Sequence, residues 1–198
     1  MIILTKRGKF SLIAPFYGLF FKFQIKYFNK ILNYTAGDFN LLQYKTILDI
    51  GCGTGALCQV LYSQGMQVTG VDAEENMIKV ARRKLRRQNI ALITADINKG
   101  LPFANQSFDI VITSYVAHGL PVDERKKLYA EMKRLAKQRV ILHDYNQNRA
   151  LLTSLIERLE GGEYFNFIKR VREELEETFA EVYIIQVDTR AAWYICTP

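Results

Sequence analysis

Cysteine, proline and long apolar runs are all scarce in this sequence. Its 198 residues include only three cysteines and four prolines. The cysteines, Cys52, Cys58 and Cys196, are odd in number and widely scattered, so their spacing indicates neither a disulfide framework nor a metal site. A reducing, cytoplasmic compartment is therefore the expected location. No apolar run reaches the roughly 20 residues that a membrane-spanning helix needs.

The N-terminal segment has one feature of a secretory signal, because basic residues precede its apolar run, Phe10–Phe21. Pro15 interrupts this run and no small-residue cleavage pattern follows it. We therefore interpret residues 1–44 as a helical arm of the same domain, which either covers the mouth of the active site or simply packs on the core. Its aromatic residues are Phe10, Phe16, Tyr17, Phe20, Phe21, Phe23, Tyr27 and Phe28.

Acidic residues are scarce in the first 40 positions, which contain six basic residues and a single acidic one, Asp38. The net charge of the whole chain is +7. A second basic cluster comprises Lys79, Arg82, Arg83, Lys84, Arg86 and Arg87, whereas the segment 173–177 is acidic. The basic cluster is either a solvated helix face or a surface that attracts nucleic acid, anionic lipid or acidic substrates.

Short apolar segments alternate with amphipathic ones from residue 45 onward, with no linker or repeat between them. The former predict buried strands and the latter predict helices. The expected strands are Thr46–Ile50, Gln67–Val71, Ile90–Thr94, Phe108–Thr113 and Arg139–His143, and the expected helices are Gly55–Gln64, Glu74–Gln88 and Asp123–Lys137. In the second helix Met77, Ala81 and Leu85 share one face, which leaves the arginines outward. This alternation indicates a parallel sheet covered on both faces.

The C-terminal segment has a different pattern. A helix is expected over Phe165–Thr178, with Phe165, Ile168, Arg172 and Leu175 along one side. Two strands follow, Glu181–Val187 and Ala191–Cys196, and the three residues between them are too few for a crossover helix, so the pair must be antiparallel. Residues 45–198 are thus predicted to form an α/β, Rossmann-like, doubly wound seven-stranded sheet with five parallel strands and a C-terminal antiparallel hairpin.

A glycine-rich turn joins the first strand to the first helix of this core. Gly51, Gly53 and Gly55 permit the positive φ angles and close approach that such a turn requires, and the helix start offers unpaired N–H groups. Asp72 ends the next strand, where a carboxylate can accept hydrogen bonds from ribose hydroxyls. The glycines alone also satisfy the dinucleotide pattern, so a nicotinamide-dependent dehydrogenase is an alternative at this point.

Several later segments resemble the class I S-adenosylmethionine-dependent methyltransferases. The segment 49–55, an acidic residue before Gly-x-Gly-x-Gly, is similar to motif I of that family, and the segments 68–77, 94–97, 101–103, 107–111 and 115–120 are similar to its later motifs in the same order. A dehydrogenase is not expected to reproduce these later motifs. The resemblance covers residues 46–120 and implies S-adenosyl-L-methionine as cofactor, with S-adenosyl-L-homocysteine as product.

The resemblance also implies roles for individual residues. Asp49 orients the loop, which Gly51, Cys52, Gly53 and Gly55 form around the methionine part of the cofactor. Asp72 binds the ribose, Ala73 or Met77 packs on the adenine, and Asp96 accepts from the adenine amino group beside the Ile97 backbone. Ser114 or Thr113, at the end of the fourth strand, faces the methionine end. For Met77, plain core packing is an equal alternative.

The acceptor side offers two histidines, which are the only ones in the chain. His118 follows the fourth strand and is the candidate for contacting the substrate or taking its proton; capping or packing is the alternative. His143 is expected to end a buried strand. Asp144 and Asn146 are possible oxygen ligands for Mg²⁺, but two residues are too weak a signal, and we predict no metal.

Missing motifs narrow the reaction. Neither the Pro-Pro-Tyr motif of adenine-amino methylases nor a Pro-Cys nucleophile follows the fourth strand, and no RNA-binding module is appended. We therefore predict a methyltransferase acting on a small, hydrophobic or aromatic acceptor. An RNA or protein methyltransferase that uses the basic surface and a catalytically inactive cofactor-binding domain are the alternatives. The sequence predicts no transmembrane segment and says nothing about oligomeric state.

Overall fold

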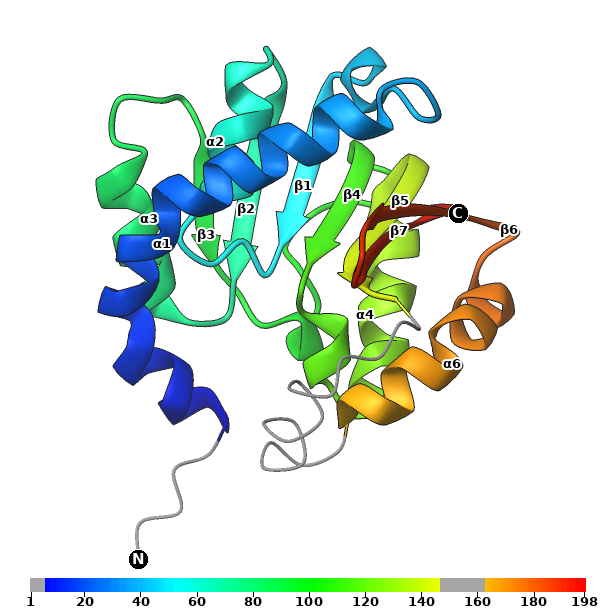
Figure 1. The fold of residues 1–198 in the computed structure, drawn as a ribbon. Coiled ribbons are helices and arrows are strands. Elements are labelled where there is room, and N and C mark those ends of the chain that lie inside the picture. Colours follow the sequence, from blue (N-terminus) through cyan, green and yellow to red (C-terminus); the bar gives the residue numbers. More distant parts are fainter. Residues whose placement is uncertain (1–5, 147–162) are drawn as a thin grey trace, which may run out of the picture. The chain divides into compact units, whose positions relative to one another are not determined.

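The computed structural model describes the backbone of residues 6–146 and 163–198, and within these ranges the side chains from residue 20 onward (Figure 1). The chain forms two compact units, Met1–Lys99 and Gly100–Pro198. The assignment of the whole chain to a single domain stays a prediction.

A three-stranded parallel sheet forms the centre of the first unit. Its strands are β1 (Thr46–Ile50), β2 (Gln67–Asp72) and β3 (Ala91–Thr94), in the order β3-β2-β1. The bounds of β1 match the prediction, β2 continues one residue further to Asp72, and β3 begins one residue later than predicted. β1 is almost wholly buried, as its continuous apolar sequence requires.

Helices cover this sheet. α2 (Ala56–Ser63) packs on β2, and α3 (Glu75–Lys84) packs on β2 and β3; the 3-10 turns η1 (Leu41–Gln43) and η2 (Ile97–Lys99) complete the unit. The predicted inner face of α3 is confirmed, because Met77, Ala81 and Leu85 are each at most 5% exposed while the arginines are exposed. α3 ends at Lys84, four residues before the predicted end.

The N-terminal arm is the helix α1 (Lys6–Thr35), which packs against α2 and α3. Phe21, Phe28, Ile31 and Leu32 are buried in this packing. The side chains of Phe10, Phe16 and Tyr17 lie outside the described residues. The described part of the arm is therefore a packing helix, and its covering of an active-site mouth stays a prediction. Within the part of the chain that the structure describes, no helix is long and apolar enough to cross a membrane.

The second unit contains a four-stranded mixed sheet in the order β4-β5-β7-β6. Its strands are β4 (Phe108–Ser114), β5 (Ala136–Tyr145), β6 (Glu181–Asp188) and β7 (Ala191–Thr197). β4 and β5 are parallel, whereas β7 is antiparallel to both β5 and β6. The predicted C-terminal hairpin is thus confirmed. With the three strands of the first unit, the chain supplies the seven strands of the expected fold class.

Two helices of the second unit differ from the prediction. α4 (Val122–Leu135) stops two residues early, since Ala136 and Lys137 already belong to β5. α6 (Glu163–Thr178) buries Tyr164, Phe167, Ile168, Val171, Glu174 and Leu175. The predicted face is therefore wrong in part: Arg172 is exposed and Phe165 is only half-buried, because the buried stripe runs through Tyr164, Phe167 and Val171 instead. This stripe also includes Glu174, which has an ionic partner on α4.

Candidate functional site: a glycine loop and a histidine–aspartate pair

The glycine loop after β1 has the backbone conformation that the sequence predicts. Gly51, Gly53 and Gly55 have φ angles of 75°, 54° and 81°. A residue with a Cβ would lose roughly 1–2 kcal/mol at each such position. At Gly55, which is the N-cap of α2, an added Cβ would also lie 2.6 Å from Leu85 Cδ1. The loop therefore requires glycine for conformation at three positions and for space at one.

Hydrogen bonds tie this loop to the end of β2. The N–H groups of Gly51 and Cys52 donate to the Val71 carbonyl at 2.8 and 3.0 Å, and the Gly53 N–H donates to Asp72 Oδ2 at 2.8 Å. The Glu74 N–H donates to the other oxygen, Asp72 Oδ1, at 2.8 Å. Burial raises the pKa of Asp72, and the two backbone donors partly oppose this. The carboxylate is thus fixed in orientation, and each of its oxygens has a second lone pair for a ligand hydroxyl.

The outer side of the loop has room for a ligand, and an unpartnered polar atom lies beneath the loop. A Cβ added at Gly53 would meet no atom within 4 Å, so the outer side of the loop is open. The buried oxygen Asp49 Oδ1 has no hydrogen-bond partner within the described residues. These features, with the fixed Asp72 carboxylate, fit a ligand that carries a ribose and a polar chain.

Asp49 lies beneath the loop in the last part of β1 and is only 1% exposed. Burial raises the pKa of its carboxyl from 3.8 to about 7, although the Cys58 thiol donates to its Oδ2 at 3.2 Å. The two cysteine thiols crowd the neighbouring strand, because a Cβ added at Gly70 would lie 2.9 Å from Cys58 Sγ and 3.0 Å from Cys52 Sγ. The side chain of Cys52 therefore faces β2; its backbone N–H donates to Val71 of that strand, and its carbonyl accepts from the Gly55 N–H within the loop.

The predicted adenine-side residues differ in exposure. Ala73 is exposed, and Asp96 and Ile97 are half-buried at the start of η2, where the Asn98 N–H donates to Asp96 Oδ1 at 3.0 Å. Met77 is only 5% exposed on the inner face of α3. Ala73, Asp96 and Ile97 thus have accessible surface, whereas Met77 packs in the core of this structure; their contact with the adenine stays a prediction.

In the second unit, the chain turns sharply at the end of β4. Ser114 is half-buried, and its Oγ has no hydrogen-bond partner among the described residues. Tyr115 adopts a left-handed φ of 54°, which is unfavourable for a bulky side chain. Its N–H donates to the His143 carbonyl on β5 at 2.8 Å, which holds the conformation. Strain of this kind at a strand end is typical of functional sites.

His118 follows in η3 (Ala117–Gly119) and forms a close pair with Asp144 at the end of β5. The distance between His118 Nδ1 and Asp144 Oδ1 is 2.8 Å; the Asp144 side chain is fully buried, while that of His118 is 26% exposed. The backbone N–H groups of His118 and Tyr145 also donate to this carboxylate, at 3.3 and 2.8 Å. Because Asp144 accepts from Nδ1–H, the neutral imidazole carries its basic lone pair on Nε2.

Aromatic rings surround this pair. Tyr145 lies 4.8 Å from the His118 ring, 5.3 Å from Tyr115 and 5.0 Å from Tyr164 of α6, measured between ring centroids. The four rings come from three segments of the unit: the turn after β4, the end of β5 and the start of α6. We call Tyr115, Tyr145 and Tyr164 the tyrosine cluster.

The other residues considered at this strand end have structural contacts. His143 is buried, and Trp193 Nε1–H donates to its Nδ1 at 3.0 Å; burial lowers its pKa from 6.5 to about 4, so it is neutral. The Asn146 side chain donates to Gln186 Oε1 at 2.7 Å and to two carbonyls of the hairpin turn. Within the described ranges, no three His, Cys, Asp or Glu side chains lie close enough together to hold a metal ion.

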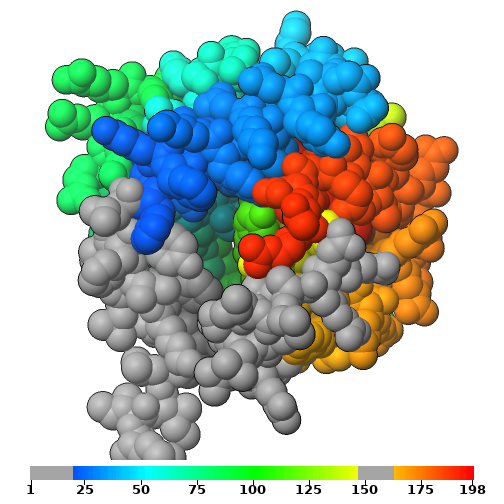
Figure 2. Space-filling view, viewed as in Figure 1, coloured from blue at the N-terminus to red at the C-terminus, as the bar shows by residue number. Residues whose placement is uncertain are grey.

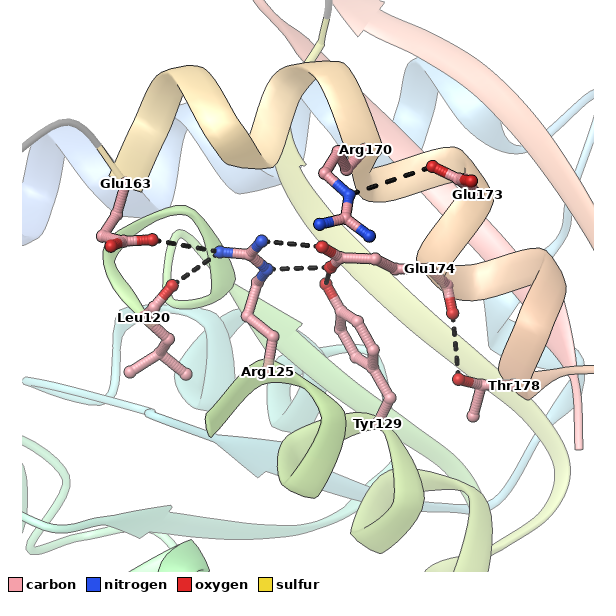
Figure 3. Close-up of polar contacts among 8 residues, drawn as sticks. All are labelled: Leu120, Arg125, Tyr129, Glu163, Arg170, Glu173, Glu174 and Thr178. Carbon is pink, nitrogen blue, oxygen red and sulfur yellow. Dashed lines mark hydrogen bonds and ion pairs between the residues drawn. The ribbon is translucent and has the colours of Figure 1, made fainter. Parts of the chain in front are cut away.

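A buried ion pair holds η3 and α6 to α4 (Figure 3). Arg125 of α4 has a fully buried side chain and donates to both carboxylate oxygens of Glu174 on α6, at 2.8 and 2.7 Å. Its Nη1 also donates to the Leu120 carbonyl at 2.6 Å and lies 3.7 Å from Glu163. Arg125 therefore connects the segment that follows His118 to α6.

The sequence predicts His118, the loop glycines and Asp72 as site residues, which stays a prediction, but it does not predict the partner of His118 or the tyrosine cluster. From the sequence, Asp144 is only a possible oxygen ligand for a metal. The available signal was a histidine after one strand and an aspartate after the neighbouring strand, since the ends of adjacent parallel strands lie together.

The comparisons with known proteins agree with this picture. Residues 47–139 match the family described as a methyltransferase domain. The chain is 38% identical over 91 residues to a demethylmenaquinone methyltransferase of Renibacterium salmoninarum, covering 46% of this chain and 36% of that protein. It is 29% identical over 160 residues to a ubiquinone biosynthesis O-methyltransferase of Mesorhizobium japonicum, covering 75% and 63%.

A solved structure gives the same fold. The magnesium protoporphyrin IX methyltransferase of Synechocystis, crystallised with bound S-adenosylhomocysteine, superposes with a TM-score of 0.62 at 17% identity, covering 100% of this chain and 89% of that one. The matched part of the chain spans only about a third of the first relative. The seven-stranded fold and the glycine loop with Asp72 nevertheless agree with the family match: residues 47–139 are similar to the methyltransferase domain, and the chain has the fold of the class I S-adenosyl-L-methionine-dependent methyltransferases.

Proposed function

We propose that this protein transfers the methyl group of S-adenosyl-L-methionine to a hydroxyl group on a hydrophobic aromatic acceptor. The observation that carries the proposal is the His118–Asp144 pair, which lies against the tyrosine cluster. Two relatives support an acceptor of the quinone type, a demethylmenaquinone methyltransferase and a ubiquinone biosynthesis O-methyltransferase, and the second also supports transfer to oxygen.

The loop residues would hold the cofactor. Gly51, Gly53 and Gly55 leave space for its methionine part, Asp72 accepts from its ribose hydroxyls, and Ala73, Asp96 and Ile97 line the adenine. Ser114 Oγ, which is buried and lacks a partner among the described residues, is assigned to the methionine end. When bound, the sulfonium supplies an electrophilic methyl group.

His118 supplies the base. An aromatic hydroxyl is a weak nucleophile until it loses its proton, so a base within hydrogen-bond reach accelerates its methylation. His118 Nε2 takes this proton while the oxygen–methyl bond forms and the sulfur–methyl bond breaks; the electron pair of the broken bond stays on sulfur and leaves a neutral thioether. Asp144 fixes the ring with Nε2 as the base and stabilises the imidazolium that results.

The tyrosine cluster recognises the acceptor. Tyr115 and Tyr164 each lie edge-on to Tyr145, at 5.3 and 5.0 Å between ring centroids. Tyr164 is buried and supports the half-buried rings of Tyr115 and Tyr145, against which a flat ring would pack. Such contacts position an aromatic hydroxyl and exclude water, which are the main tasks of the protein in a methyl transfer.

A radiolabelled methyl-transfer assay with phenols, catechols and hydroquinones of increasing hydrophobicity tests the proposal. We expect His118→Asn to lower kcat by about 10²–10⁴-fold and to abolish the acidic limb of the pH–rate profile, with the affinity for S-adenosylhomocysteine unchanged. Asp123→Asn on the exposed start of α4 is a matched control and leaves the rate unchanged. Full activity of His118→Asn would remove the base from the mechanism.

Total RNA and a protein extract serve as competing acceptors in the same assay. Label that enters RNA or protein while no aromatic hydroxyl compound accepts it would overturn the proposal. That outcome would favour the alternative in which the exposed basic side chains of α3 bind a macromolecular substrate.

A further inference from the structure

The outer side of α1 exposes large aromatic rings. Phe20, Phe23 and Tyr34 are 59%, 69% and 61% exposed, whereas Phe21 and Phe28 on the opposite side are buried against the core. Positions separated by 3 and 14 residues fall on one side of a helix with 3.6 residues per turn. Figure 2 shows the described part of this helix, in blue, at the molecular surface.

Lysines form a second stripe beside these rings. Lys22, Lys26 and Lys30 are exposed and follow one another at intervals of four residues. The sequence contains no Asp or Glu before Asp38, so no acidic side chain of this helix offsets their charge. We call Phe20, Lys22, Phe23, Lys26, Lys30 and Tyr34 the α1 outer face.

The basic helix α3 adjoins α1. Lys84 Nζ lies 5.1 Å from the centroid of the Phe21 ring, which connects the two helices. Three exposed basic residues lie around the end of α3, namely Arg83, Arg86 and Arg87. They add to the positive potential of the same unit, and their charge is of the sign that an anionic surface attracts.

We propose that the α1 outer face binds the surface of a membrane that contains anionic lipid. A helix with aromatic rings beside lysines lies in the plane of a bilayer, where the rings enter the headgroup region and the lysine ammonium groups reach the lipid phosphates. This combination accounts for the rings, which are costly to leave in water, and for the absence of acidic residues. The inference does not depend on the identity of the methyl acceptor.

A second copy of the chain fits this face less well. Two such helices face to face would bring the lysines of both together, with no acidic residue on either helix to pair with them. Like charges in contact oppose association. The charge pattern therefore favours an anionic partner, and the exposed rings favour one with an apolar interior.

Co-sedimentation of the full-length protein with lipid vesicles tests this proposal. We expect binding to vesicles of phosphatidylcholine and phosphatidylserine, and little binding to phosphatidylcholine alone. The triple variant Lys22→Gln, Lys26→Gln, Lys30→Gln should bind about 100-fold more weakly, from roughly fivefold per lysine. Phe20→Ala with Phe23→Ala should weaken binding about tenfold or more, since both rings lose their apolar contact with lipid.

Matched controls separate this face from general charge and hydrophobicity. Replacing the exposed Lys126, Lys127 and Lys169 by Gln removes the same charge from α4 and α6, and Tyr183→Ala removes a 56% exposed ring from β6. Both controls should retain vesicle binding. All variants should keep the thermal midpoint and the S-adenosylhomocysteine affinity of the wild type, because the changed side chains are exposed.

Three results would overturn the proposal. The first is equal binding to both kinds of vesicle, and the second is an equal loss of binding in the α4/α6 lysine control. The third is a different partner for this face: dimerisation in sedimentation experiments that Phe20→Ala with Phe23→Ala abolishes, or RNA binding in the absence of vesicle binding.

Discussion

Asp49 offers the sharpest test of how burial controls a charge in this protein. Its side chain is 1% exposed beneath the glycine loop, and one of its oxygens has no hydrogen-bond partner within the described residues. Burial raises the pKa of its carboxyl from 3.8 to about 7. The perturbation is Asp49→Asn, which keeps the shape of the side chain and an oxygen that accepts the Cys58 thiol but removes the titration.

The magnitude follows from the difference between the pKa values of the folded and unfolded states. About three pKa units correspond to about 4 kcal/mol, at 1.36 kcal/mol per unit. The folded state binds the proton more tightly, so the stabilisation by the protonated carboxyl is complete below pH ~4 and is lost as the pH rises through ~7. Relative to the amide variant, the wild-type protein should therefore lose up to about 4 kcal/mol of unfolding free energy across this window.

Urea unfolding of both proteins at several pH values between 4 and 8 measures this difference. The gap in unfolding free energy between Asp49→Asn and wild type should grow with pH and become constant above the folded-state pKa. Asp38→Asn, at an exposed position, should follow the wild-type profile. A gap that does not vary with pH would show that the pKa of Asp49 is the same in the folded and unfolded states, and the argument from burial would be refuted.

Three further substitutions test the loop, the sheet and the ion pair. Gly53→Ala should lose about 1–2 kcal/mol of stability, because its backbone is left-handed. It should also weaken S-adenosylhomocysteine binding in calorimetry, because its Cβ would enter the open side of the loop. Gly70→Ala should lower the unfolding free energy by about 1–3 kcal/mol, since its Cβ would lie 2.9 Å from Cys58 Sγ; unchanged stability would contradict this close packing. Arg125→Met should cost about 3–5 kcal/mol in urea unfolding by leaving the Glu174 carboxylate buried and unpaired, and adding Glu174→Met should restore most of that loss.

Local sequence patterns were sufficient to predict the parallel core. β1 is buried on both sides, so its apolar residues are continuous, and the glycines after it are required by backbone angles that depend only on the immediate turn. The C-terminal hairpin was predictable for a similar reason, because the short connection between β6 and β7 permits only an antiparallel pair. These features are determined within a few residues of where they occur.

The errors arose where distant residues determine the structure. The end of α4 was placed too late because no glycine or proline marks it, and β5 begins at once with Ala136. The predicted inner face of α6 omits Glu174, because a glutamate in an acidic stretch is expected to lie in solvent. Glu174 is buried nevertheless, since Arg125, 49 residues earlier in the chain, supplies its counter-charge. No local periodicity contains this information.

The candidate base shows the same limit. The position of His118 after β4 was visible in the sequence, but its chemistry depends on Asp144, which lies 26 residues away at the end of the adjacent strand. Without the carboxylate at 2.8 Å from Nδ1, the sequence gives no reason to prefer Nε2 as the base. The residue could be predicted from the sequence, whereas its tautomer required the structure.

The ion pair and the candidate base are connected through the backbone. Arg125 donates to the Leu120 carbonyl at 2.6 Å, two residues after His118, and the same guanidinium binds Glu174. The Arg125→Met, Glu174→Met double variant removes the buried charges together, so the fold can recover while the donor to Leu120 is lost. If that donor positions His118, the double variant should remain stable and still turn over more slowly than wild type. If the pair serves stability alone, stability and turnover should recover together. Only the double variant separates the two roles, because either single substitution damages the fold as well.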